Sequence, residues 1–208
     1  MTATISGSSG VTFPAGGVGN PAGTVVGTTD TQTLTNKTLT SPTITGAAVS
    51  SMASTVITAA TAVASTSGTS IDFTGLPSWV KRITVMFDVT SLSATSDYLI
   101  QIGDSGGIET TGYLSSSADG PTLTVNSYTT GFGIRVGSAA ATLIGSIYIN
   151  NITSNTWISG GNLARGGGGV FITNAGTKTL TATLDRVRIT TVTGTDTFDA
   201  GTVNIFYE

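Results

Sequence analysis

A short internal repeat runs from Thr31 to Gly46, where the sequence TQTLTNKTLTSPTITG divides into consecutive pentads of the form x-x-Thr-[Leu/Ile]-Thr. β-Branched threonines favour an extended backbone, but one aliphatic side chain per unit cannot enclose a core within a single chain. Side chains of a strand alternate between faces, so a period of five places successive aliphatics on one side only if each unit bends once. The repeat therefore predicts a stem of several identical chains that bury Leu34, Leu39 and Ile44 around a shared axis. A Thr-rich linker is the alternative interpretation.

The residues from Asp30 to Ile44, DTQTLTNKTLTSPTI, resemble an element that recurs in bacteriophage tail-fibre and other virion structural proteins. Two later segments, 71–87 (IDFTGLPSWVKRITVMF) and 101–113 (QIGDSGGIETTGY), are similar to the C-terminal β-domain of such proteins. The resemblance implies a virion component, a homotrimer with a stem and a β-rich head. It does not distinguish attachment to the tail from attachment to the capsid.

Charged side chains are scarce. They make up 9% of the 208 residues, against about 25% in typical soluble proteins. The surface must therefore consist mainly of hydroxyl and amide groups. A hydrophobic content of 38% with a net charge of −3 predicts an ordered chain, since disorder goes with low hydrophobicity and high net charge. The slight acidity and the scattered basic residues argue against a nucleic-acid partner.

Cysteine is absent, which excludes disulfides and thiolate metal sites, and no motif predicts a cofactor. The first ten residues have neither a basic n-region nor an apolar h-region, and no apolar run is long enough to cross a bilayer. We therefore expect no cleaved signal and no membrane insertion. A virion protein assembled in the host cytoplasm fits these features.

Four parts are expected along the chain. Residues 1–29 carry no charged side chain and lack periodicity, which predicts an extended arm that binds other virion proteins. Residues 30–46 form the stem. Residues 47–64 are a bridge or a first strand: a 3-4-3-4 spacing of apolar residues fits a helical seam, whereas the β-branched content over 55–63 favours a strand. The apolar residues with this spacing are Val49, Met52, Val56, Ala59 and Val63.

Residues 65–208 show short alternating runs separated by Gly, Pro, Asn and Asp, which predicts an all-β head, an antiparallel β-sandwich or jelly roll. The clearest run is 81–90, where every second residue is expected to face the core, namely Ile83, Val85, Phe87 and Val89. Further strands are expected over 98–102, 132–136, 144–152, 170–172 and 203–207. A change of apolar phase within 180–192 predicts a bulge near Asp185 and Arg186.

Gly103 to Gly107 reads GDSGG, the sequence around the nucleophile of chymotrypsin-like proteases. That chemistry needs an imidazole, and the chain contains no histidine, so a Gly-rich turn is the preferred interpretation. Asp97, Asp104, Glu109 and Asp119 fall in one loop-rich region, where a glycosidase pair or a calcium site is an alternative to solvated acids. The glycines after Arg165 lack the Lys-[Ser/Thr] of a phosphate-binding loop. No enzyme activity is expected.

Recognition of a neutral glycan needs aromatic rings beside amide and hydroxyl donors, and loops are the expected place for them. The receptor-binding candidates are Tyr113, Asn126, Tyr128, Asn155, Trp157 and Asn162. Trp79, beside Pro77, is expected to pack in the core. The sequence thus predicts a non-enzymatic trimeric fibre that anchors by its N-terminus and presents a head to a host-surface glycan. A capsid decoration protein or head fibre is the nearest alternative, followed by a lone carbohydrate-binding module.

Overall fold

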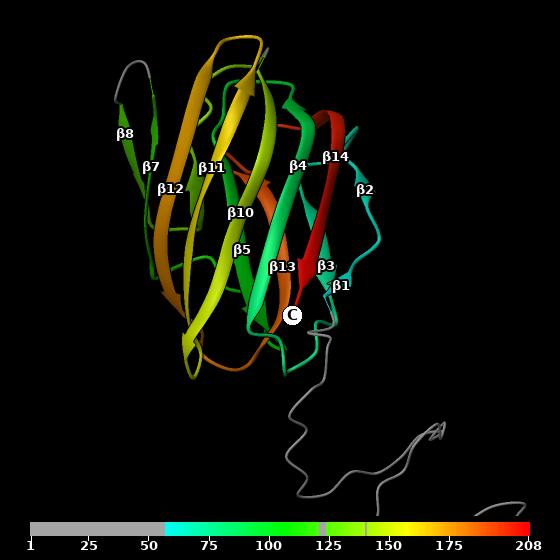
Figure 1. Cartoon of the computed structure of the whole chain (residues 1–208), viewed down its shortest axis with the longest axis vertical. Coiled ribbons are helices and arrows are strands. Elements are labelled where there is room, and N and C mark those ends of the chain that lie inside the picture. The colour runs from blue at the N-terminus through cyan, green and yellow to red at the C-terminus, as the bar shows by residue number, and fades with distance from the viewer. Residues whose placement is uncertain (1–56, 121–123, 140) are drawn as a thin grey trace, which may run out of the picture. The chain divides into compact units, whose positions relative to one another are not determined.

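The computed structural model describes residues 57–120, 124–139 and 141–208, and these residues form an antiparallel β-sandwich without a helix (Figure 1). The predicted fold class of the head is therefore confirmed. The arm, the pentads with Leu34, Leu39 and Ile44, and the first half of the 47–64 stretch lie outside the described residues. No helix in the described ranges is long and apolar enough to span a membrane.

Fourteen strands are present in the described residues. They are β1 (Thr58–Ala59), β2 (Val63–Ala64), β3 (Ile71–Thr74), β4 (Arg82–Leu92), β5 (Tyr98–Asp104), β6 (Gly107–Ile108), β7 (Tyr113–Asp119), β8 (Val125–Tyr128), β9 (Phe132–Ile134), β10 (Thr142–Thr153), β11 (Thr156–Gly166), β12 (Val170–Thr179), β13 (Leu184–Thr191) and β14 (Phe198–Tyr207). One sheet has the order β1-β14-β4-β10-β11-β12-β7-β8, with β2 also paired to β14. The other has the order β3-β13-β5-β6, with β9 paired to β5. The first sheet faces the viewer in Figure 1 and the second lies behind it.

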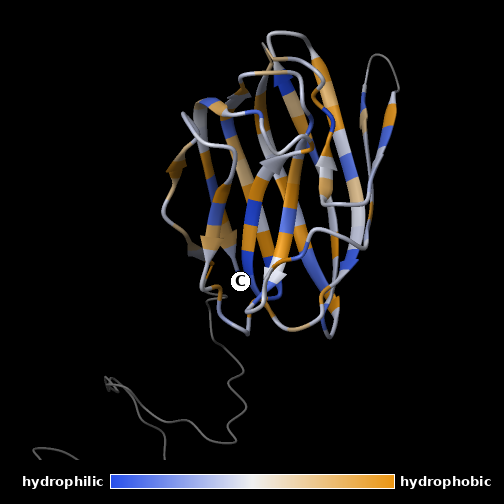
Figure 2. Ribbon diagram, turned by 180° about the vertical axis from the view of Figure 1, so that it is seen from behind, coloured by the Kyte–Doolittle hydropathy of each residue, from blue (hydrophilic) through white to orange (hydrophobic). Residues whose placement is uncertain are grey.

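Alternation along the strands builds the interior between the two sheets. Ile83, Val85 and Phe87 of β4 are buried while the residues between them are more exposed, as predicted. Figure 2 shows the same alternation of hydrophobic and hydrophilic residues along the strands from behind. Aromatic rings fill the middle of the core, where Phe87 packs edge-on against Tyr98 with centroids 6.0 Å apart. The sandwich therefore buries its own apolar faces.

The prediction for Val89 is wrong. Its side chain is 45% exposed and its φ is +52°, in the left-handed region. The pairs Asp88↔Thr202 and Ser91↔Ala200 leave one more residue on β4 than on β14, so β4 bulges here and the alternation restarts in a new phase. The bulge predicted near Asp185 is confirmed, because the register of β13 against β5 shifts between Leu184 and Arg186.

The described part of the 47–64 stretch is extended. β1 and β2 both pair with β14, which makes residues 58–64 part of the nine-stranded sheet. Of the two alternatives for this stretch, a strand rather than a helical seam describes residues 57–64. The sheet thus begins before Ser65.

A polar seam holds β9 inside the sandwich. The side chains of Ser115 and Ser117 accept hydrogen bonds from the backbone nitrogens of Gly133 and Arg135, at 3.1 and 3.0 Å. Buried Asn174 donates from Nδ2 to the carbonyl oxygen of Gly133 at 2.6 Å. These bonds pair the backbone groups of β9 that face away from β5. They stabilise the fold, because an unpaired buried backbone group costs about 1 to 3 kcal/mol.

Candidate functional site

Five of the six receptor-binding candidates lie in strands, so the expectation that they lie in loops is wrong for all but Asn155. Tyr113, Tyr128 and Trp157 are also buried. Tyr113 is 1% exposed, and its ring packs edge-on against Phe132 at 5.1 Å. Its hydroxyl accepts a hydrogen bond from the backbone nitrogen of Ile102 at 2.8 Å. Burial raises the pKa of this phenol, which keeps it protonated inside the core.

Asn126 and Tyr128 are both tied to the carboxylate of Asp97, which they reach from β8. Asn126 Nδ2 and the Tyr128 hydroxyl donate to Asp97 Oδ2 at 2.9 and 2.8 Å. Asp97 Oδ1 accepts from the backbone nitrogens of Val136 and Gly137 at 2.8 and 3.0 Å. Burial raises the pKa of the Tyr128 phenol, and its hydrogen bond to Asp97 raises it further. These side chains fasten β8 and the segment after β9 to the start of β5, which is a structural role.

Trp79 is the opposite case, since it was expected in the core and is 53% exposed. It lies in the connection between β3 and β4, and its ring is tilted against that of Tyr207 with centroids 5.9 Å apart. One face of the indole is therefore open to solvent at the end of the molecule where β14 finishes.

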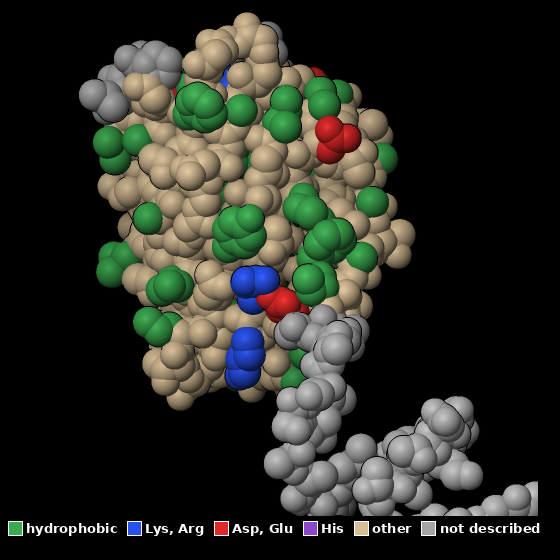
Figure 3. All heavy atoms as spheres, in the orientation of Figure 1, with side chains coloured by type: hydrophobic (Ala, Val, Ile, Leu, Met, Phe, Trp, Pro, Cys, Tyr) green, Lys and Arg blue, Asp and Glu red, His purple; other side chains and the backbone are tan. Residues whose placement is uncertain are grey.

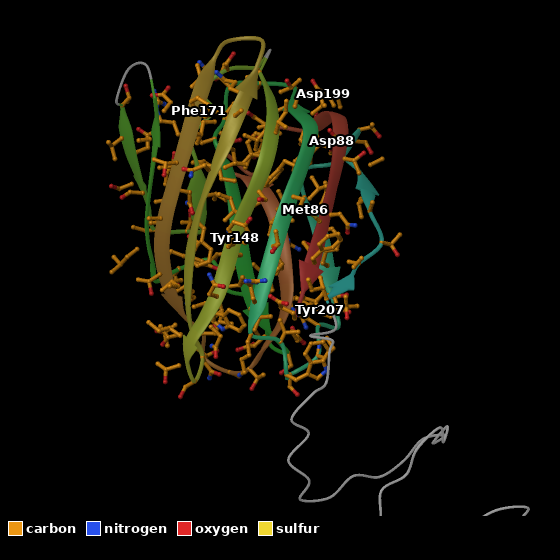
Figure 4. The ribbon with its side chains drawn as sticks, in the orientation of Figure 1. Met86, Asp88, Tyr148, Phe171, Asp199 and Tyr207 are labelled. Carbon is orange, nitrogen blue, oxygen red and sulfur yellow. The ribbon has the colours of Figure 1, made fainter. Side chains whose placement is uncertain are left out.

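Asn162 lies on the outer face of the nine-stranded sheet, beside a broad uncharged surface. Figure 3 shows mainly uncharged side chains over this face, with Lys and Arg gathered at its lower end. Figure 4 places Met86, Tyr148 and Phe171 on it, from β4, β10 and β12. A shallow depression of about 330 Å³ lies beside the half-exposed Tyr148. It is also lined by Arg82, Asn150, Ile158, Ser159 and Gly160.

Asn155 and Trp157 line a second, more enclosed hollow of about 250 Å³ at one end of the sandwich. Three connections build it. The β3–β4 segment contributes Ser78, Val80 and Lys81; the β10–β11 turn contributes Ser154 and Asn155; the segment entering β13 contributes Thr183 and Leu184. Trp157, 3% exposed, forms part of its wall, and its indole Nε1 has no hydrogen-bond partner in the described residues.

The β10–β11 turn that carries Asn155 is held in place by Asn151. Asn151 Nδ2 donates to the carbonyl oxygens of Ser154 and Thr156 at 2.8 and 3.2 Å. Ser154 itself has a φ of +43° in this tight turn. The turn is therefore pinned, and the side chains of Ser154 and Asn155 are left on the rim of the hollow.

The four carboxylates considered for catalysis or calcium are occupied by structural bonds. Asp104 accepts from the Thr181 hydroxyl at 2.8 Å and from the Gly106 nitrogen at 2.8 Å, and these bonds lower its pKa. Burial works to raise the pKa of Glu109, but its bonds to Lys178 and Thr181 outweigh burial and the net pKa is lowered. Asp97 is described above. Asp119 pairs with Arg135 at 3.5 Å.

Neither Asp104 nor Glu109 has the raised pKa of a general acid, so this pair lacks the asymmetry that glycoside hydrolysis requires. Across the described ranges no three Asp, Glu, His or Cys side chains gather to hold a metal ion. The GDSGG sequence forms the turn predicted for it, with Ser105 and Gly106 joining β5 to β6. The glycines after Arg165 form the turn between β11 and β12.

The hollow is the site that the structure adds to the sequence-based candidates. Its lining residues Ser78, Lys81 and Thr183 were not among them, because their proximity depends on the order of strands in the sheets. What the arrangement offers chemically is binding: one ammonium group, an amide and hydroxyls around an indole. No family model, no curated protein and no solved structure matches this chain.

Proposed function

We propose that this chain is a non-enzymatic structural protein of a bacteriophage virion, a homotrimeric fibre that attaches through residues 1–29 and presents the sandwich for adhesion to the host surface. The observation that carries the proposal is the combination of a fibre-like element over Asp30 to Ile44 with a sandwich that encloses its own core within the described residues from 57 to 208. A display domain needs this independence, because its stability must not depend on the part that anchors it.

The chemistry of the sandwich supports display rather than turnover. The acids of the loop-rich region hold strands and turns together, and the chain has no histidine. The face shown in Figure 3 carries mainly uncharged side chains, which can contact sugar hydroxyls and ring faces. Such groups meet a depression in the hollow beside Trp157 and on the face around Tyr148.

The experiment that tests the proposal supplies particles lacking the native protein with either the full chain or the fragment 47–208. We expect the full chain in purified particles. The fragment should give the circular dichroism of a β-protein, since the sandwich buries its own core, yet be missing from particles because residues 1–29 are absent. Labelled antibody and electron microscopy then locate the full chain on the tail or on the capsid. If the fragment entered particles as efficiently as the full chain does, the sandwich rather than residues 1–29 would be the part that attaches to the virion.

The trimer is expected to depend on the pentads. Replacing Leu34, Leu39 and Ile44 together with Asp places charge where apolar side chains are proposed to meet, at a cost of several kcal/mol for each unpaired buried ion. The mass from light scattering should fall from trimer to monomer, while replacement of the same three residues with Met should preserve the trimer. A trimer that survives the Asp substitutions would make the repeat a linker.

A further inference from the structure

We propose that the hollow beside Trp157 binds a sugar residue that carries a carboxylate, such as a hexuronic acid. The inference rests on the adhesion role proposed above, because a host-surface glycan is the source of such a sugar. It goes beyond that role by naming the site and the chemical class of its ligand. Three observations carry it: an unpaired charge, a set of uncommitted polar side chains, and a rigid frame.

The charge belongs to Lys81. Five of the seven Lys and Arg residues in the described ranges form ion pairs: Arg82 with Glu208, Arg135 with Asp119, Lys178 with Glu109, Arg186 with Asp185 and Arg188 with Asp72. Of the other two, Arg165 donates to the carbonyl oxygen of Val136 at 2.6 Å. Lys81 has only a long 3.5 Å contact with Asn151 Oδ1, and no Asp or Glu lines the hollow. The hollow therefore carries a positive charge that no carboxylate of the described residues neutralises.

Uncommitted polar side chains line the hollow together with Lys81. The hydroxyls of Ser78, Ser154 and Thr183 and the amide of Asn155 line the hollow, and none makes a side-chain hydrogen bond to another described residue. Buried Trp157 Nε1 also has no partner there. By contrast, the side chains of Asp97 and Thr181 are fully used in structural bonds. Hydroxyl and amide groups left free around a cation match a ligand with several hydroxyls and one carboxylate.

The frame of the hollow is rigid. The backbone nitrogen of Lys81 donates to the carbonyl oxygen of Glu208 at 2.7 Å, and its carbonyl oxygen accepts from the nitrogen of Asn151 at 2.8 Å. Leu180, near the third wall, donates from its nitrogen to the carbonyl oxygen of Asn155 at 3.0 Å. All three connections are thus tied to one another through their backbones, and a ligand meets a preformed site at little cost in ordering.

Trp157 supplies the readout, because the chain has two tryptophans and the other, Trp79, is exposed and lies outside the lining. In the full chain with Trp79→Phe, glucuronic acid should change the Trp157 fluorescence in a saturable way. Glucose, which has a CH₂OH in place of the carboxylate, lacks the charge-assisted bond to Lys81. Its affinity should therefore be lower by about tenfold or more. Inorganic phosphate should not saturate the signal, because it lacks the sugar hydroxyls.

Matched variants locate the site. Lys81→Met keeps the aliphatic part of the side chain and should weaken the binding of glucuronic acid about tenfold or more. Arg188→Met removes a positive charge that does not line the hollow and should leave the affinity unchanged. The proposal is overturned if glucose and glucuronic acid bind equally, if phosphate competes equally, or if Tyr148→Ala rather than Lys81→Met abolishes binding. Binding to the purified chain does not depend on virions, so its failure is separate from a failure of incorporation into particles.

Discussion

Replacing Asp97 with Ala should lower the free energy of unfolding by about 3 kcal/mol or more, one of the two largest effects expected for a single substitution in this sandwich. The carboxylate accepts four hydrogen bonds, from Tyr128, Asn126 and the backbone nitrogens of Val136 and Gly137. A hydrogen bond to a charged group contributes about 1.5 to 3 kcal/mol, and the orphaned donors add a desolvation cost where they are buried. Equilibrium denaturation followed by circular dichroism measures the loss.

Two controls separate this network from a general effect of charge. Asp97→Asn keeps one oxygen as an acceptor but turns an NH₂ group towards the donors that bonded the other oxygen. The loss in free energy of unfolding should therefore be about half of that caused by Asp97→Ala. Asp88 is exposed on the nine-stranded sheet, and its side chain has no hydrogen bond or ion pair to another described residue. Asp88→Ala should therefore change stability by no more than about 0.5 kcal/mol. If Asp97→Ala were as mild as Asp88→Ala, the four bonds would not be holding β8 and the segment after β9.

Local alternation was enough to predict the fold class and many of the buried faces. Ile83, Val85 and Phe87 were expected in the core from a period of two, and the bulge in β13 from a break in that period. Val89 was missed because the extra residue on β4 is defined only by its pairing with β14, which lies more than a hundred residues away in the sequence. A pattern within one strand carries no information about the register of its partner.

The aromatic candidates show a second limit. Tyr113, Tyr128 and Trp157 were expected in loops, as aromatic rings beside amide and hydroxyl donors for a glycan, yet all three are buried. The two tyrosines can be buried because their hydroxyls form hydrogen bonds to residues distant in the sequence. Tyr128, for example, bonds Asp97, which lies 31 residues away. Trp79 lacks such enclosure and is exposed although Pro77 is close to it.

The candidate site was predictable only in part. Asn155 and Trp157 were named from composition around one turn, and both line the hollow. Lys81 stood out in the sequence only as one of two adjacent basic residues. Among the cations of the described ranges it is set apart by having neither a carboxylate partner nor a short hydrogen bond, and that can be recognised only when the partners of the other cations are known.

Gly133→Ala is the second large destabilisation we expect, again about 3 kcal/mol or more. Gly133 is the central residue of β9, and a Cβ placed on it would overlap the ring of Tyr128. That ring cannot swing away cheaply, because its hydroxyl is bonded to Asp97 at 2.8 Å, and β9 cannot move away because Asn174 holds its carbonyl oxygen. Overpacking a closed site costs about 1 to 3 kcal/mol, and more when the neighbours are pinned.

Gly160→Ala is the matched control, since a Cβ at Gly160 would meet only the carbonyl oxygen of Asn174, at an ordinary 3.8 Å. This substitution should change stability by less than about 1 kcal/mol. In a Tyr128→Ala background the space beside Gly133 is open, so adding Ala there should cost less than about 1 kcal/mol as well, and the double-mutant cycle should show strong coupling. Additive losses would mean that the ring of Tyr128 is not what excludes a side chain from β9. Coupling of Gly133 with Tyr128, together with the loss caused by Asp97→Ala, would indicate that the Asp97 carboxylate acts through Tyr128 to hold β9 against the polar seam.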